Sequence, residues 1–286
     1  DLFITAVSTG PLFGRLLARQ FHEMWKILQC PQNWVLVEQG AFNGELCNDV
    51  LCSLKSYAPD CFAATHVHII EPFSCLQSLQ ALRLKSFRNR VTWHRTCESL
   101  PHFCGVHYSN ELLDAFPVDL LRRETSGWQE LRVCHGENGL QLEAFPIENQ
   151  ALLEAASTLP DCELGFTTEI NLQCGPWLKQ ILEKLKDGWL LTFDYGMSQS
   201  ELLLPHRRNG TLSAYRAQRR EPNLLAQPGE QDLTAHVNFT AIAKQARIHG
   251  WHIAGYANQH RFFTGLAPLH FQDQARELTA EEQKEL

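Results

Sequence analysis

Short apolar runs alternate with amphipathic stretches over the first two thirds of the chain. The apolar runs predict strands at 34–39, 65–73, 90–94, 103–118 and 188–196. Apolar residues at helical spacing predict helices at 11–28, 44–57, 74–86 and 176–188. Because strands and helices alternate at this spacing, the pattern predicts an α/β fold, with a mostly parallel, Rossmann-like sheet covered by helices on both faces.

The segment between the fourth and fifth predicted strands is long for a simple connection. It contains two strand-like runs around a "GENG" turn, which predict a β-hairpin at 128–145. We therefore expect one domain, 1–286, whose core carries an inserted hairpin and helical region at about 118–174. Beyond the fifth strand, the pattern predicts antiparallel strands at 211–219 and 251–257, a helix at 239–248 and a charged helix at 275–286.

Composition and charge narrow the class of protein. Hydrophobic residues make up 44% of the chain and charged residues 20%, which is ordinary for a globular protein. The net charge of -7 disfavours nucleic acid and anionic membrane as partners, and no apolar stretch approaches the ~20 residues that span a bilayer. The first residue is not Met, so we expect the true N-terminus to lie upstream, and no targeting signal is inferred.

The ten cysteines show no C-x-x-C spacing, and the closest pair is Cys47 and Cys52. Most lie in apolar surroundings, where cysteine behaves as a small core residue; examples are Cys61, Cys75, Cys104 and Cys162. We therefore expect buried free thiols, no metal site and a reducing compartment.

Polar side chains stand at the carboxyl ends of four predicted strands, where open α/β sheets bind their ligands. They are Glu38, Glu71, Asn110 with Glu111, and Asp194 with Tyr195. Gly40 and Gly44 follow the first strand and would let the backbone turn and approach a ligand. Glu71 is predicted to accept hydrogen bonds from both hydroxyls of a ribose. The alternative is a solvated acid at a strand end.

The loop between the two glycines distinguishes between cofactors. A dinucleotide pyrophosphate requires closely packed glycines, whereas Ala41, Phe42 and Asn43 occupy the middle of this loop. The Glu38 carboxylate would repel a pyrophosphate and attract a cation. S-adenosylmethionine carries a sulfonium, an ammonium and no phosphate, so the loop favours this cofactor.

Six motifs occur in the order found in one enzyme family: "DLFITAVSTGPLFG", "VEQGAFNGEL", "SNELLDAFPV", "FDYG", "GTLSAYR" and "PGEQDLTAHVNFT". The chain, from residue 1 to about 260, resembles the MidA-like S-adenosylmethionine-dependent methyltransferases. This family contains the mitochondrial complex I assembly arginine methyltransferase and many bacterial members. The resemblance implies a class I methyltransferase fold.

The resemblance also implies a role for individual residues. Glu38, Gly40, Ala41 and Gly44 would form the cofactor loop, Glu71 would hold the ribose, and Asn110 and Glu111 would lie near the methyl group; Phe3 and Thr5 would close over the cofactor. Two features depart from the family pattern. The loop usually reads E-x-G-P-G-x-G, and Gln218 stands where histidine is common, which leaves the substrate open.

Methyl transfer to arginine would require acids beside the guanidinium, which stays protonated and is a poor nucleophile until carboxylates orient it. Glu111 and Asp114 would pair with it and would share one face if "ELLDAF" forms a helical turn. The alternative for Asp114 is a turn acid. Asp232 and His236 would act together, with His236 accepting a proton or orienting Asp232; alternatively, Asp232 caps a helix.

The resemblance and the acids favour arginine N-methylation of a protein, with a respiratory complex I subunit as candidate substrate. The alternatives are methylation of another nitrogen, such as an amide or a base, and a non-catalytic scaffold that binds S-adenosylmethionine. We expect a protein substrate, no nucleic acid and a homodimer as a candidate assembly. The basic stretch 206–221 would be a solvated surface or a docking site for an acidic partner. The bacterial cytoplasm is the favoured compartment, and the mitochondrial matrix applies if the source is a eukaryote.

Overall fold

The computed structural model describes residues 10–137 and 139–274, and the side chains up to residue 268. Its main sheet is entirely parallel, with strand order β3-β2-β1-β4-β9. The strands are β1 (Trp34–Gln39), β2 (Thr65–Ile70), β3 (Val91–His94), β4 (Phe103–Asn110) and β9 (Leu185–Phe193). The predicted parallel sheet is therefore confirmed. Strand β4 ends at Asn110, well before the predicted end at 118, and the other strand ends lie within about three residues of the predicted ones.

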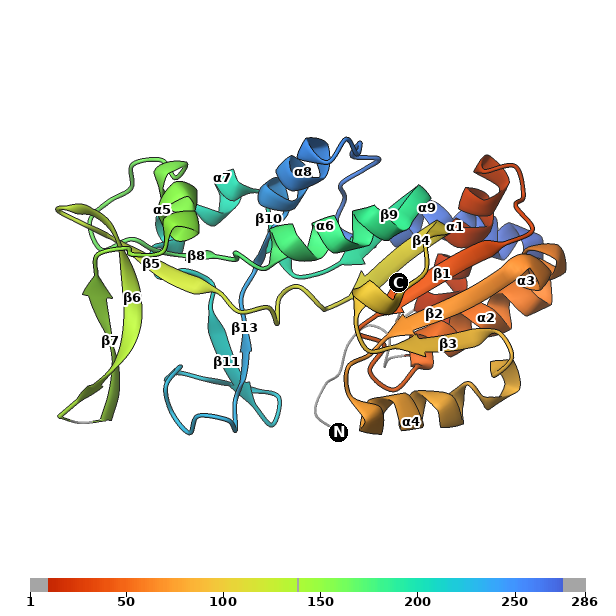
Figure 1. Cartoon of the computed structure of the whole chain (residues 1–286), viewed down its shortest axis with the longest axis horizontal. Coiled ribbons are helices and arrows are strands. Elements are labelled where there is room, and N and C mark those ends of the chain that lie inside the picture. The colour runs from red at the N-terminus through yellow and green to blue at the C-terminus, as the bar shows by residue number, and fades with distance from the viewer. Residues whose placement is uncertain (1–9, 138, 275–286) are drawn as a thin grey trace.

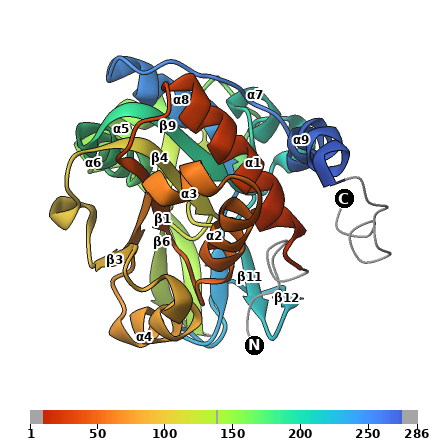
Figure 2. The same cartoon turned by 90° about the vertical axis from the view of Figure 1, so that its right-hand side faces the viewer.

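Helices cover both faces of the main sheet. One face carries α1 (Leu12–Ile27), α2 (Glu45–Tyr57), α3 (Pro59–Ala64) and α9 (Gln259–Gln274). Figure 2 views this face, with α1 beside α2 and α9. The other face carries α6 (Cys174–Lys184) and α8 (Phe239–Ile248). Helix α4 (Ser74–Arg83) and the 3₁₀ helices η2 (Lys85–Phe87) and η3 (Cys97–Ser99) flank β3.

The α1 helix shows why the sequence folds in this way. Its apolar residues recur every three or four positions, so they form one stripe, and Leu16, Leu17 and Phe21 are fully buried against the sheet and α2. Burial of such side chains contributes about 1.5–3 kcal/mol each. The sequence pattern and the fold agree here.

A second, antiparallel sheet is formed between β4 and α6. Its order is β7-β6-β5-β8, and Figure 1 shows it at the end of the molecule remote from the main sheet. The strands are β5 (Asp119–Glu124), β6 (Gly127–Gly136), β7 (Gly139–Phe145) and β8 (Thr167–Ile170), with α5 (Gln150–Ser157) between the last two. Strands β6 and β7 pair antiparallel, which confirms the predicted hairpin.

Short strands complete the chain beyond β9. Strands β11 (Ser213–Arg216), β12 (Arg219–Glu221) and β13 (Asp232–Thr234) form a small antiparallel sheet. Strands β10 (Gly196–Met197) and β14 (Val237–Asn238) pair separately in parallel. Helix α7 (Gln199–Leu202) and the 3₁₀ helix η4 (Pro205–Arg207) lie between β10 and β11.

Three predictions are corrected or fall outside the described residues. Residues 251–257 form no strand, because their alternating apolar residues find no partner strand and Ile253 and Tyr256 are exposed. All ten cysteines are free, but Cys75 and Cys104 are exposed and Cys162 is half-buried, so their predicted burial is wrong. Cys75 lies on the outer face of α4, and Cys104 follows a register shift in β4. The predicted helix at 275–286 lies outside the described residues.

Candidate functional site

The order of the strands fixes where a ligand binds to the main sheet. Successive strands extend from β1 to one side as β2 and β3, and to the other side as β4 and β9, so the order reverses between β1 and β4. Open parallel sheets bind ligands at such a switch point, outside the carboxyl ends of the strands. Gln39 pairs with Ser109 there, so the loop at Gly40 and the turn at Glu111 leave the sheet side by side.

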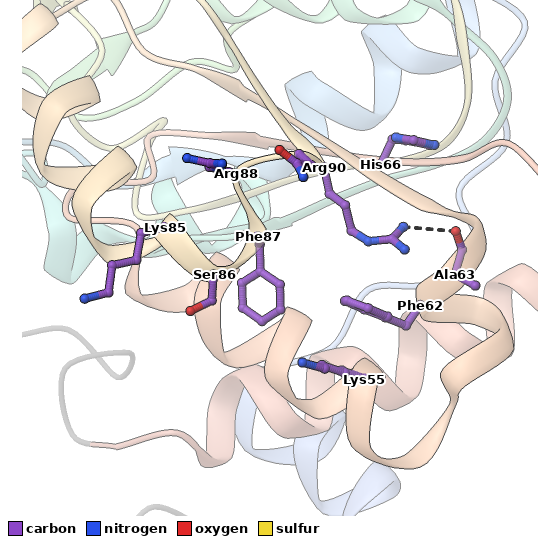
Figure 3. Close-up of a pocket in the computed structure, with 10 residues that line it drawn as sticks. Lys55, Phe62, Ala63, His66, Lys85, Ser86, Phe87, Arg88 and Arg90 are labelled. Carbon is purple, nitrogen blue, oxygen red and sulfur yellow. Dashed lines mark hydrogen bonds between the residues drawn. The ribbon is translucent and has the colours of Figure 1, made fainter.

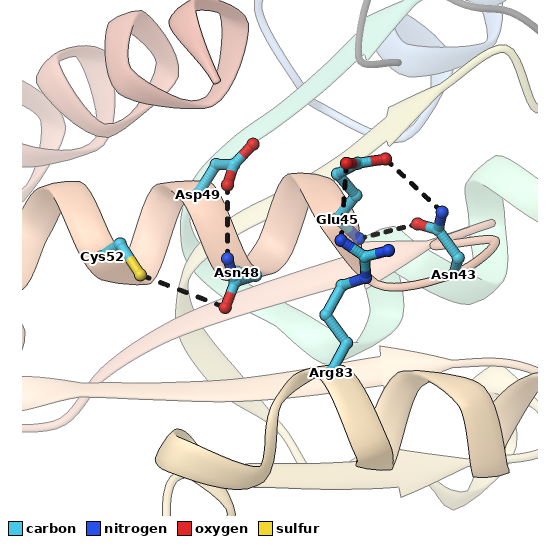
Figure 4. A network of polar contacts seen from close by, with 6 residues as sticks. All are labelled: Asn43, Glu45, Asn48, Asp49, Cys52 and Arg83. Carbon is cyan, nitrogen blue, oxygen red and sulfur yellow. Dashed lines mark hydrogen bonds and ion pairs between the residues drawn. The ribbon is translucent and has the colours of Figure 1, made fainter. Parts of the chain in front are cut away.

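The loop after β1 is ordered although its middle lacks glycine. Gly40 and Gly44 both have φ of 78°, which L-residues with a side chain adopt at a cost. The Gly44 amide donates to the Ala41 carbonyl (2.7 Å), and Asn43 Oδ1 accepts from the Glu45 amide (3.0 Å). Figure 4 shows Asn43 and Arg83 converging on Glu45, which links the start of α2 to α4. These local hydrogen bonds fix the conformation of the loop without further glycines between Gly40 and Gly44.

Glu71, directly after β2, is buried and held by its neighbours. Its Oε1 accepts from the Phe73 amide (3.0 Å), and its Oε2 accepts from Gln80 Nε2 (3.2 Å). A carboxylate has about four acceptor positions, so two remain for a ligand. The position and the remaining acceptor capacity suit a diol.

Gln80, on α4, is fully buried and joins three parts of the site. Its Nε2 donates to the Phe42 carbonyl (2.9 Å) as well as to Glu71, and its Oε1 accepts from Trp93 Nε1 (2.9 Å). A single carboxamide therefore fixes the glycine loop and the acid after β2 relative to each other. Sequence reasoning missed this residue, because a glutamine in a helix ordinarily faces water.

Glu38 lies on the side of the sheet that α1 and α2 cover. Its Oε2 accepts from the Tyr108 hydroxyl (2.9 Å), and the carboxyl is buried. Burial raises the pKa of Glu38 from 4.5 to about 7, and the Tyr108 hydrogen bond opposes this in part. A cation bound nearby would lower this pKa and favour the carboxylate. Tyr108 was not among the predicted site residues.

The raised pKa of Glu38 predicts a pH-dependent stability. Between pH 4.5 and about 7 the folded chain keeps a proton that the unfolded chain has lost, so this group makes the fold less stable as pH rises through that window. Glu38→Gln has no carboxyl group at this position, so its stability lacks this contribution to the pH dependence. Its free energy of unfolding relative to wild type should therefore increase by about 2–3 kcal/mol between about pH 5 and about pH 8. Urea unfolding measures this, and a difference that does not change with pH would contradict it.

The turn after β4 carries two predicted site residues and is held by Asp194. Asp194 Oδ2 accepts from the amides of Leu112 (3.1 Å) and Leu113 (2.7 Å). Glu111 adopts φ of 49°, an unusual value for glutamate, and its amide donates to the Phe193 carbonyl (2.9 Å). The helical turn that would have given Glu111 and Asp114 a common face is not formed. Residues 111–116 form bends and a non-helical turn that includes Asp114.

Four acids nevertheless lie close enough to influence one another. Burial, followed by the Asp114 charge, raises the pKa values of Glu111 and Asp194 to about 7. Burial and the Asp232 charge raise the pKa of Asp114. In residues 10–137 and 139–274, no salt bridge provides any of the four with a cationic partner. The site therefore presents uncompensated acids, which suit a positively charged ligand.

Asp232 and His236 have different neighbours. Asp232 begins β13 and not a helix, so the helix-capping alternative is wrong. Because the chain is extended from Asp232, residues four apart are separated by about 13 Å along it, and no hydrogen bond joins the two side chains in the described residues. The His236 amide donates to Thr211 Oγ1 (3.0 Å), and burial and Arg207 lower the pKa of His236. We retain Asp232 as a candidate and assign His236 no joint role with it.

Glu169, on β8 of the four-stranded second sheet, links that sheet to the segment before β11. Its Oε1 accepts from the amides of Thr211 (2.6 Å) and Leu212 (2.8 Å), and its Oε2 accepts from Thr211 Oγ1 (3.2 Å). Burial raises the pKa of Glu169, whereas these hydrogen bonds lower it. Since Thr211 also holds His236, Glu169 positions the segment that follows Asp232.

Removal of this carboxylate should loosen the segment. In Glu169→Ala, the amides of Thr211 and Leu212 lose their acceptor, and each should exchange with deuterium about tenfold faster or more, because an unpaired buried donor costs about 1–3 kcal/mol. Hydrogen–deuterium exchange measures this. Glu163→Ala, at an exposed glutamate nearby in sequence, is the control. Equal exchange in both variants would contradict this role for Glu169.

The remaining predicted site residues are placed as follows. Asn110 ends β4 beside Glu111 and hydrogen-bonds to it, and Ala41 is buried in the glycine loop. Gln218 lies with Ala217 in the turn between β11 and β12, where both have positive φ. Phe3 and Thr5 lie outside the described residues. Among the described residues, no three His, Cys, Asp or Glu side chains are placed so that they could hold a metal ion together.

Together, these features define a class of protein. A parallel sheet of this order, with a glycine turn after the first strand and a buried acid after the second, is the Rossmann-like class I methyltransferase fold. A family profile described as "Putative S-adenosyl-L-methionine-dependent methyltransferase" matches residues 16–257. The chain belongs to this family.

Similar proteins include both curated relatives and solved structures. "Protein arginine methyltransferase NDUFAF7 homolog, mitochondrial" of Caenorhabditis elegans is 25% identical over 277 residues, which cover 87% of this chain and 62% of the relative. The protein of the same name from Drosophila melanogaster is 26% identical over 274 residues, covering 87% and 60%. The chain thus spans about three fifths of the length of these relatives.

The structural similarity covers the whole chain. A protein from Burkholderia thailandensis, described as a "likely methyl transferase" and bound to S-adenosyl-homocysteine, has a TM-score of 0.85 and 26% sequence identity. The match covers 100% of this chain and 72% of that one. No helix among residues 10–137 and 139–274 is long and apolar enough to cross a membrane.

Proposed function

We propose that this chain binds S-adenosylmethionine at the switch point and transfers its methyl group to an arginine of a protein. The observation that carries the proposal is a group of four acids at and near the turn after β4, to which the salt bridges among the described residues give no cationic partner: Glu111, Asp114, Asp194 and Asp232. The names of the relatives, protein arginine methyltransferases, support the same acceptor. The net charge of -7 disfavours a nucleic-acid acceptor.

The residues of the site fit this cofactor. Glu71 retains acceptor positions for the ribose hydroxyls, and the loop from Gly40 to Gly44 lets the backbone approach the ligand. Glu38 would favour the positive charge of the cofactor. When bound, S-adenosylmethionine supplies a methyl group on a sulfonium, a good leaving group.

The acids would prepare the nucleophile. Glu111 projects from a sharply turned backbone at the carboxyl end of β4 and would accept two hydrogen bonds from the guanidinium. Such pairing orients one nitrogen toward the methyl carbon and stabilises the charge of the side chain. Asp194 would hold the turn that carries Glu111, and Asp114 and Asp232 would add negative potential. The guanidinium nitrogen would gain the methyl group as the carbon–sulfur bond of the donor breaks, with the electron pair staying on sulfur, and the guanidinium would lose one proton to these carboxyls or to solvent.

The test uses radiolabelled S-adenosylmethionine, the purified protein and a cell extract. Label is expected on arginine of an extract protein, established by amino-acid analysis and mass spectrometry. Over the same incubation, Glu111→Gln should give strongly reduced labelling. Label on another nitrogen would show that the acceptor is not arginine. Tight cofactor binding without any labelled product would favour a non-catalytic scaffold.

The finer features are proposals as well. We propose one domain over 1–286, with an insertion at about 118–174 that reaches toward the protein substrate. The resemblance to the MidA-like family points to a respiratory complex I subunit as acceptor. We also propose a homodimer as a candidate assembly. The proposed compartment is the bacterial cytoplasm, or the mitochondrial matrix if the source is a eukaryote.

A further inference from the structure

A second concave region lies at the opposite edge of the main sheet. Its lining comes from α2, α3 and the start of β2, and from η2 with the turn that leads into β3 (Figure 3). The residues are Lys55, Phe62, Ala63, His66, Lys85, Ser86, Phe87, Arg88, Asn89 and Arg90. We call it the amino-edge pocket. Strand β2 has six residues and separates this pocket from Glu71 by about 20 Å, so the pocket is not part of the cofactor site.

The amino-edge pocket is basic in a chain of net charge -7. Its lining includes four permanent cations and no acid. Lys55, Lys85 and Arg88 are exposed, and none has an ion pair in the described part of the chain. Like charges held together on different elements repel one another, so an anion placed among them would be attracted.

The floor of the pocket is firmly built. Arg90 Nη1 donates to the carbonyls of Ala63 (3.0 Å) and Thr65 (3.1 Å), and its guanidinium lies 4.5 Å from the centroid of the Phe62 ring. The Phe62 and Phe87 rings meet edge to face, and Figure 3 shows both beside Arg90. A carboxylate could therefore meet the exposed cations over a fixed base, without first ordering this part of the chain.

We propose that the amino-edge pocket docks an acidic peptide segment of a partner protein. The carboxylates of the segment pair with Lys55, Lys85 and Arg88, and the adjacent Ser86 and Asn89 side chains provide further polar contacts. This interaction is independent of the methyl transfer proposed above, because it uses the other edge of the sheet.

The test measures fluorescence anisotropy of a fluorescein-labelled octaglutamate peptide with the full chain. Octaglutamate should bind at about 20 mM NaCl and more weakly at about 150 mM, whereas octaglutamine should not bind. The triple variant Lys55→Glu, Lys85→Glu, Arg88→Glu should weaken binding at least about tenfold. Arg90 is left unchanged because it supports the fold.

A matched control has the same net charge. Lys186→Glu, Lys244→Glu and Arg247→Glu reverse three exposed cations outside the pocket, and binding should stay within about twofold of wild type. Thermal unfolding and S-adenosylmethionine binding verify that both triples are folded. Equal weakening in the two triples, or no binding of octaglutamate to wild type, would overturn the proposal. If octathymidylate binds more tightly than octaglutamate, and only the triple variant of the pocket loses this binding, the ligand of the pocket is a nucleic acid and not a peptide.

Discussion

Glu71→Ala is expected to weaken S-adenosylmethionine binding by about 100-fold. The carboxylate would accept from two ribose hydroxyls, and hydrogen bonds to a charged group contribute about 1.5–3 kcal/mol each. A loss of about 3 kcal/mol corresponds to two orders of magnitude in Kd. Isothermal titration calorimetry of wild type and variant measures the change.

The control for this variant must separate binding from folding, since Glu71 also holds Phe73 and Gln80. Glu98→Ala removes an exposed glutamate near β3 and should bind the cofactor as wild type does. Thermal unfolding without cofactor reports the structural cost in each variant. A folded Glu71→Ala protein that binds within about threefold of wild type would refute the ribose role.

Glu111→Gln should lower kcat by about 100- to 1000-fold while the Kd for S-adenosylmethionine stays within about threefold. The amide retains the shape of the side chain but loses the charge that faces the guanidinium, and the effect is therefore expected in the chemical step. The rate is measured with the protein acceptor identified by labelling, at saturating cofactor.

Two comparisons make the Glu111 result specific. Glu98→Gln makes the same chemical change at an exposed position and should leave kcat unchanged. Asp194→Asn should lower kcat by disturbing the turn that carries Glu111, because Asp194 accepts from the amides of that turn. If Glu111→Gln retains full kcat, the acceptor is positioned by other groups.

The core of the fold could be predicted because its signals are local. Strands β1, β2 and β4 are apolar runs that end in polar or glycine residues, and α1 has an unbroken apolar stripe. Residues 251–257 show the limit of this reasoning. Alternation of apolar residues indicates a strand only if a neighbouring strand offers its edge, and sequence spacing does not reveal that.

The candidate site was predictable where strand order decides it. Acids at the carboxyl ends of parallel strands meet at one edge of a sheet, so Glu71 and Glu111 could be predicted as site residues. The supporting residues were not predictable, because the partners of Gln80, Tyr108 and Glu169 are distant in sequence. Asp232 and His236 were expected to act together because they are four residues apart, whereas the extended backbone at β13 carries them away from each other.

Gln80 fixes the positions of residues in the candidate cofactor site before the cofactor binds. One carboxamide holds the Phe42 carbonyl, Glu71 and Trp93 together. The conformational entropy that a mobile loop would lose on binding the cofactor is therefore already lost when the chain folds. Replacement of Gln80 would lower the affinity for the cofactor, because the loop and Glu71 would then lose conformational entropy on binding. Gln80 itself need not contact the cofactor for this effect.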